Sequence, residues 1–253
     1  MQIQILKQLN FFKNQKLLSL DLLPNQGYCN INYKLHTTQS DYLIRKFKSN
    51  DTVNISRSFE FRTQKHVAIK NIAPTPFLLD KKNSFMITEF TKGIHKSKLH
   101  NLELIKLVKT VKKFHSIKVN TKEYNLKKDF NYYSQLLQDK NSQYIINQSF
   151  KELVKLKRFK KELVLTHHDL NPKNIIFTIN SIKIIDWEYA GVNDLFFDLA
   201  SLCCEFKLSK KEEILLLKTY FQKSRINDID KLNSYKIIYK NLCLLWFKSL
   251  EKN

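Results

Sequence analysis

The sequence predicts an α+β fold in two lobes, a small β-rich N-terminal lobe with one helix and a larger, mainly helical C-terminal lobe. Short apolar runs alternate with turn residues over 17–47, which is typical of paired strands. From residue 101 on, apolar residues recur at helical spacing. A chain of 253 residues is long enough for two lobes that share a cleft.

In the N-terminal lobe, Asn32–His36 and Tyr42–Phe47 read as a hairpin joined by the polar turn TTQSD. Apolar residues among charges predict a helix from Ile55 to Ile72, which ends at Ala73-Pro74 because the residue before proline disfavours the helical region. The runs PFLLD and SFMITEF read as two further strands that complete a small sheet.

A hinge near 89–93 leads into the larger lobe, so the expected domains are 1–90 and 91–253. Its first helix covers 101–115, and a second helical stretch covers roughly 129–161. Three short β-type runs follow, LVLTH, NIIFTI and SIKIIDW, of which the last two read as a hairpin within this lobe. From Asp198 the chain is helical again, with ILLLKTYF and IIYKNLCLLWF as strongly apolar helices.

The formal net charge is +21, which would suit a nucleic-acid binder if the charge were clustered. Lysine is instead spread along almost every segment, which indicates a compositional bias and a solvated basic surface. The cysteines form no zinc-type pair and no disulfide framework, and no apolar run approaches the roughly 18 residues of a membrane span. We therefore expect a cytoplasmic protein with no specific nucleic-acid partner and no membrane insertion.

The segment LVLTHHDLNPKNIIF carries the clearest chemical signal, because it places His167, Asp169 and Asn174 in an H-x-D-x-x-x-x-N spacing. Twelve residues after Asn174, Asp186 ends the apolar run IKII. Phosphoryl transfer needs a carboxylate that accepts the hydroxyl proton and oxygen ligands that hold Mg²⁺ on the phosphates. Asp169 and Asn174 from one tight loop, with Asp186 from the end of the next strand, supply such a set.

The pair HHDLNPKN and IIDWEYAG resembles the catalytic and metal-binding loops of the choline/ethanolamine kinase and aminoglycoside phosphotransferase superfamily. The resemblance extends with decreasing specificity over about the whole chain, and it implies a bilobal protein-kinase-like fold that uses ATP and Mg²⁺. IIDWEYAGVNDLFFDLASL is particularly similar to bacterial choline kinases and thiamine-kinase-like proteins. The same resemblance implies Asp169 as the base and Asn174 and Asp186 as the metal ligands of an ATP-dependent enzyme, with His167 and Asp198 as structural support of the site. Glu188, the second acid of DWE, either tunes the metal, contacts substrate or bonds to backbone.

In the N-terminal lobe, NQGYCNINYKL resembles the family's phosphate-covering loop, with Gly27 and Asn30 in place but Gln26 where a first glycine is expected. The resemblance implies that Arg45 contacts the phosphates and pairs with Glu60 of the following helix. It also implies that the backbone of a hinge at Glu89, Phe90 and Thr91 binds the adenine edge.

The acceptor is predicted to be a small alcohol, choline or ethanolamine first. Trp246 resembles the second aromatic of the W-x-x-W helix that cages the ammonium group in choline kinases, whereas the first aromatic falls on Cys243. Thiamine and aminoglycosides are the alternative acceptors. A catalytically silent nucleotide-binding scaffold, suggested by Gln26, is the alternative of another class.

Overall fold

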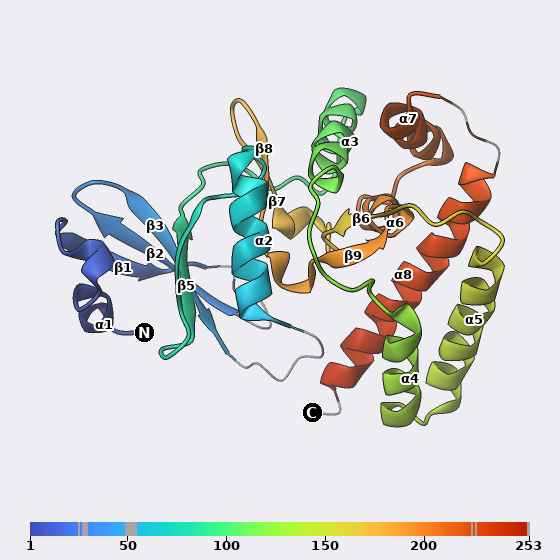
Figure 1. Ribbon diagram of the computed structural model, residues 1–253, viewed down its shortest axis with the longest axis horizontal. Coiled ribbons are helices and arrows are strands. Elements are labelled where there is room, and N and C mark those ends of the chain that lie inside the picture. The colour runs from blue at the N-terminus through green and yellow to red at the C-terminus, as the bar shows by residue number, and fades with distance from the viewer. Residues whose placement is uncertain (25, 27–29, 49–54, 224, 226, 252–253) are drawn as a thin grey trace. The chain divides into compact units, whose positions relative to one another are not determined.

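The computed structural model describes the chain apart from residues 25, 27–29, 49–54, 224, 226 and 252–253 (Figure 1). By their contacts the residues form two compact units, one of Met1–Ile94 with Ile176–Tyr189 and one of His95–Ile175 with Ala190–Asn253. The functional assignment of 1–90 and 91–253 as nucleotide-binding and catalytic domains stays a prediction.

The first unit is built on one antiparallel sheet in the order β1-β2-β3-β5-β4. The strands are β1 (Leu17–Leu22), β2 (Asn30–Thr37), β3 (Asp41–Phe47), β4 (Pro76–Asp80) and β5 (Phe85–Glu89). The predicted hairpin is confirmed as β2 and β3, which pair in a register that sets Asn32 opposite Arg45. The strand β1 was not predicted. Its residues alternate only weakly between buried and exposed positions.

The N-terminal residues, whose secondary structure was not predicted, form α1 (Ile3–Lys7) and the 3₁₀ turn η1 (Asn10–Phe12). Leu6 and Phe12 are buried in a cluster with Tyr42, Ile44 and other apolar residues of the sheet. Burying these side chains removes apolar surface from water and holds the segment on the sheet.

The predicted helix of the first unit is α2 (Arg57–Ile69), shorter at both ends than the apolar pattern indicated. Ser56 caps it, because its side chain accepts a hydrogen bond from the backbone N–H of Phe59. The helix packs against β4 and the turn η3 (Trp187–Tyr189), so its first turn faces the segment that contains Glu188.

The hairpin of β7 (Ile175–Phe177) and β8 (Ile182–Ile184) was expected inside the larger lobe, but nearly all of it groups with the first unit. Backbone bonds between Ile94 and Phe177 join it to the chain that follows β5. Gly93 permits this approach, because a Cβ there would lie 2.6 Å from the carbonyl oxygen of Phe177.

The second unit is mainly helical. Its helices are α3 (Asn101–His115), α4 (Leu126–Leu136), α5 (Lys140–Leu156), α6 (Phe196–Glu205), α7 (Lys210–Phe221) and α8 (Asp228–Leu250). The single helical stretch expected over 129–161 is wrong, since α4 ends at Leu136 and a new helix begins after Asp139. The Asp139 side chain accepts from the backbone N–H of Ser142, a cap that starts α5.

A short antiparallel pair, β6 (Leu163–Thr166) and β9 (Gly191–Asp194), lies among these helices. The strand β9 was not predicted, because GVND carries no apolar alternation of its own. The pair matters for function because β6 leads directly into the loop that holds Asp169. No helix among the described residues has the length and apolar character needed to cross a membrane.

Candidate functional site

The loop after β6 contains the predicted base. The 3₁₀ turn η2 (Pro172–Asn174) follows Asn171, whose side chain caps it by accepting from the backbone N–H of Lys173. Proline at the first position of a helical turn costs no hydrogen bond, since that N–H has no partner in any case. The local sequence thus fixes a tight loop that returns Asn174 to Asp169.

Both oxygens of the Asp169 carboxylate accept hydrogen bonds from side-chain amides. Nδ2 of Asn171 donates to Oδ1 at 2.9 Å, and Nδ2 of Asn174 donates to Oδ2 at 2.7 Å. Asn174 also donates to the backbone carbonyl of Asp169 at 3.0 Å. Because the Asn174 amide nitrogen is used in this way, its carbonyl oxygen is the atom left to face a ligand.

Asp198, in the first turn of α6, is fully buried and binds the backbone of the loop that contains Asp169. Its carboxylate accepts from the backbone N–H groups of His167 at 2.8 Å and of His168 at 2.9 Å. Nε2 of His115, the last residue of α3, lies 3.1 Å from the same carboxylate. Burial alone raises the pKa of Asp198, and the hydrogen bond from His115 lowers it below its ordinary value.

The sequence did not single out His115. Its Nδ1 lies 2.8 Å from the hydroxyl of Tyr220 on α7, so it joins α3 and α7 to the loop through Asp198. A histidine at the end of an apolar helix face reads as an ordinary residue of the last turn. Only its place beside Asp198, far away in the sequence, reveals the role.

Two residues of the predicted loops have left-handed backbone conformations, His168 at φ 69° and Asp186 at φ 65°. Such conformations are uncommon for residues other than glycine and gather at functional sites. The His168 ring is buried, with Tyr124 and Phe197 at ring-centroid distances of 4.5 and 4.9 Å. Nε2 of His168 also contacts Thr166 and Asn193, so the ring is a packed part of the loop.

The first unit contains the other half of the predicted site. Arg45, on β3, forms ion pairs with Glu60 of α2 and with Asp186, the latter at 2.6 Å between Nη1 and Oδ1. The pairing of Arg45 with Glu60 is the one predicted from the sequence. Asp186 remains partly exposed, whereas Arg45 and Glu60 are buried.

Glu188 is buried in the same cluster. Its Oε2 accepts from Nη1 of Arg57 at 2.8 Å and from Nδ2 of Asn30 at 3.2 Å. Burial, with the nearby charge of Asp186, raises its pKa. Arg57 was missed by the sequence analysis, although its place three residues before Glu60 puts both on one helix face. A contact of Glu188 with substrate stays a prediction.

The profile of the phosphotransferase enzyme family (APH) matches residues 22–235. The chain belongs to this family. It is 26% identical over 229 residues to the Protein LicA homolog of Mycoplasma capricolum subsp. capricolum. The aligned region covers 88% of this chain and 87% of that protein.

Solved structures with a similar fold include choline kinases. The choline kinase LicA from Streptococcus pneumoniae matches with a TM-score of 0.84 at 23% identity, over 98% of this chain and 90% of that one. A crystal structure of LicA in complex with AMP matches with a TM-score of 0.81 at 23% identity, over 99% and 88%. These matches confirm the predicted α+β, kinase-like fold of the phosphotransferase.

The glycine-poor loop of the phosphotransferase is braced by the residue that replaces glycine. Oε1 of Gln26 accepts from the backbone N–H of Asn32 at 2.7 Å, and its Nε2 donates to the carbonyl of Asn32 at 3.1 Å. The Gln26 carboxamide therefore bonds through both of its polar atoms to the backbone of one residue of β2. Gly27 lies outside the described residues, and its contact with phosphate stays a prediction.

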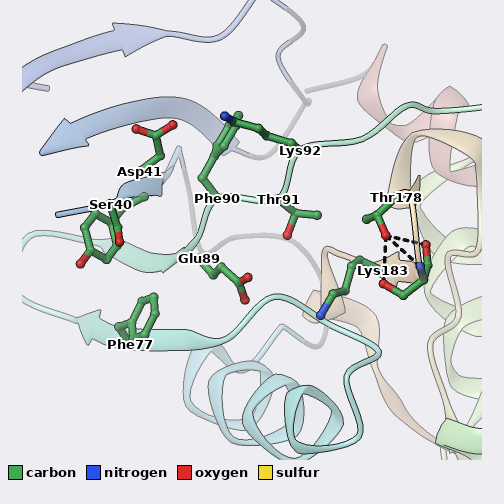
Figure 2. Close-up of a pocket in the computed structure, with 11 residues that line it drawn as sticks. Ser40, Asp41, Phe77, Glu89, Phe90, Thr91, Lys92, Thr178 and Lys183 are labelled. Carbon is green, nitrogen blue, oxygen red and sulfur yellow. Dashed lines mark hydrogen bonds between the residues drawn. The ribbon is translucent and has the colours of Figure 1, made fainter.

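The hinge of the phosphotransferase lies beside a cavity of about 530 Å³ in the first unit. Figure 2 shows the side chains of Glu89, Thr91 and Lys183 around this opening. Oε2 of Glu89 accepts from the backbone N–H of Thr75 at 3.1 Å, which pins the end of β5 to β4. Adenine binding by the hinge backbone stays a prediction.

One face of α8 carries Trp246, which was predicted to contact the acceptor. Cys243 and Tyr239 precede it by three and seven residues, which places all three on one side of the helix. The Tyr239 hydroxyl donates to Glu205 at 2.9 Å. Burial raises the pKa of Cys243 to about 12, with smaller contributions that include the charge of Asp169, so this face lies within electrostatic reach of the base.

Proposed function

We propose that this phosphotransferase transfers the γ-phosphate of ATP to the hydroxyl of choline, with ethanolamine as the next candidate. The observation that carries the proposal is the Asp169 carboxylate, which two asparagine amides hold at the end of β6. Family membership supplies the reaction class, and the similarity to LicA proteins supports the choice of acceptor.

Asp169 would accept the proton of the acceptor hydroxyl. A general base must be oriented and within hydrogen-bond reach of that proton. Asn171 and Asn174 orient the carboxylate, and the bonds of Asp198 to the preceding backbone keep the loop in place. The carboxylate also stays partly exposed, so a bound hydroxyl could reach it.

Mg²⁺ would be held by the carbonyl oxygen of Asn174 and the carboxylate of Asp186. Both are hard oxygen donors, and Mg²⁺ usually takes only one or two protein carboxylates together with phosphate and water. When bound, the ion neutralises charge on the phosphates. Arg45, held by Glu60, would contact the phosphates from β3. A related LicA structure contains AMP, which supports nucleotide binding.

The acceptor's ammonium group would bind along the face of α8. Trp246 offers a partly exposed aromatic ring, which attracts cations through its electron-rich face. Tyr239 on the same side of the helix is buried, and its hydroxyl donates to Glu205, whose negative charge would favour a cation nearby.

ATP as the donor, and reduced thiols at Cys203, Cys204 and Cys243, support a cytoplasmic location.

The test is to measure ADP release by the purified protein with Mg²⁺, ATP and one acceptor at a time from choline, ethanolamine, thiamine and an aminoglycoside. We expect the highest kcat/KM with choline. Asp169→Asn should lower kcat by about 10²-fold or more while nucleotide binding persists. Asp230→Asn, an exposed acid on α8, serves as the matched control. Preference for another acceptor would contradict the choline assignment, and an undiminished Asp169→Asn rate would contradict the base.

A further inference from the structure

Arg57, the first residue of α2, bridges two acids that lie far apart in the sequence. Its Nη1 lies 3.0 Å from Oε2 of Glu60 and 2.8 Å from Oε2 of Glu188. Glu60 in turn pairs with Arg45, and Arg45 pairs with Asp186, two residues before Glu188. The contacts therefore form a closed ring that links β3, the first turn of α2 and the segment from Asp186 to Glu188.

Apart from Asp186, whose side chain is 28% exposed, the members of the ring are almost completely removed from water. The side chains of Arg45, Glu60, Arg57 and Glu188 are 7%, 1%, 9% and 4% exposed. Charges buried to this extent are costly unless each has a partner. Two guanidinium groups serve three carboxylates here, so the loss of Arg57 would leave Arg45 as the single arginine among Glu60, Asp186 and Glu188.

The guanidinium of Arg57 is held in place by its surroundings. It lies over the ring of Phe47 at 4.0 Å, a cation–π contact at the end of β3. The Ser56 cap fixes the first turn of α2, on which Arg57 lies. Arg57 is therefore an anchored group that can hold other side chains in position.

We propose that Arg57 is a positioning residue of the nucleotide site, and that by holding Glu60 and Glu188 it keeps Arg45 and Asp186 where phosphate and metal bind. This inference rests on the proposed function for the roles of Arg45 and Asp186. Without Arg57, Glu60 loses one of its two cations and draws Arg45 more strongly. Glu188 would also repel the neighbouring carboxylate of Asp186 with only Arg45 left to offset the repulsion.

The proposal predicts a loss of nucleotide affinity that depends on charge at position 57. Because a single nitrogen of Arg57 makes both contacts, a lysine ammonium can keep part of the bridge although it lacks the planar group that stacks on Phe47, whereas a methionine of similar length carries no charge. We expect Arg57→Met to raise the Kd for Mg·ATP about tenfold or more, and Arg57→Lys to raise it clearly less than Arg57→Met does. Arg62→Met, an exposed arginine on the same helix, should leave it unchanged.

Titration calorimetry with Mg·ATP and with Mg·ADP gives these constants without any acceptor. A failure of choline turnover would thus count against the proposed function and leave this test intact. The acceptor KM of Arg57→Met, measured with whichever acceptor turns over, should change less than about twofold, because the contacts of Arg57 lie within the first unit. Circular dichroism and Tm establish that each variant is folded.

If Arg57→Met does not fold, the double variant Arg57→Gln with Glu188→Gln replaces it, since no Glu188 carboxylate is then buried without a cation. It should show the same loss of affinity. The proposal would be overturned if the Kd for Mg·ATP of Arg57→Met, or of this double variant, were equal to that of Arg62→Met. So would an Arg57→Lys variant as weak as the methionine variant, because the bridging charge would then not be the cause.

Discussion

Nδ2 of Asn174 lies 2.7 Å from Oδ2 of Asp169, so the residue proposed as a metal ligand also orients the proposed base. The two roles use different atoms of one carboxamide. The amide nitrogen donates to Asp169, and the carbonyl oxygen is left for Mg²⁺. A substitution at Asn174 should therefore affect both functions together.

Asn174→Ala is expected to lower kcat by about 10²-fold or more, because it removes a metal ligand and a donor to the base. The Mg²⁺ concentration needed for half-maximal rate should also rise. Steady-state assays over a Mg²⁺ series measure both effects. Asn180→Ala, an exposed asparagine in the β7–β8 turn, is the control. An unchanged Mg²⁺ requirement would argue against Asn174 as a ligand.

Trp246→Ala should raise the KM for choline about tenfold with little change in the KM for ATP. Loss of one aromatic face removes a cation–π contribution of about 0.5–2 kcal/mol, and a tenfold change corresponds to about 1.4 kcal/mol. Leu244→Ala is the matched control, since Leu244 lies on the same helix α8 and its side chain is half-exposed. Equal effects of the two substitutions would remove Trp246 from the acceptor site.

His115→Phe is expected to lower the free energy of unfolding by about 2–3 kcal/mol, because the buried Asp198 carboxylate loses a hydrogen-bond donor. Tyr220→Phe removes only the hydroxyl at the other ring nitrogen and should cost about 1 kcal/mol. Urea unfolding measures both. The order of these two values is the critical result, and the reverse order would show that Asp198 does not depend on His115.

Asp129, buried on α4, gives a prediction about pH. Burial raises its pKa from 3.8 to about 6, so the folded protein binds more protons than the unfolded chain between these values. Stability contributed by this group is therefore lost as the pH rises from about 4 to about 6, and the loss persists above that window. Asp129→Asn lacks the charge and should be more stable than the wild type at pH 7.5, by up to about 3 kcal/mol.

The advantage of Asp129→Asn should shrink as the pH falls towards 4.5, where the wild-type carboxyl is mostly protonated. Urea unfolding at several pH values from 4.5 to 7.5 follows this difference. Asp230→Asn, an exposed acid, should match the wild type throughout. A difference for Asp129→Asn that does not vary with pH would show that the ionisation of Asp129 is not its cause.

Much of this fold could be predicted because its signals are local. The helix 101–115 coincides with α3, and PFLLD coincides with β4, since apolar period and turn residues act within a few residues. The errors arose where local signals were weak. The break between α4 and α5 depends on the Asp139 cap, and β9 has no apolar alternation and becomes a strand by pairing with β6.

For the site, the sequence by itself was enough to predict which groups carry the chemistry. The prediction came from two local patterns, the spacing from His167 to Asn174 and the apolar run before Asp186. Each pattern indicated the candidate residues and the loop that contains them. Only the tertiary structure decided which side chains hold them, namely Arg57 with Glu188 and His115 with Asp198. These partners lie 131 and 83 residues apart. A contact at such a separation depends on the packing of several elements at once, which no short window of sequence contains.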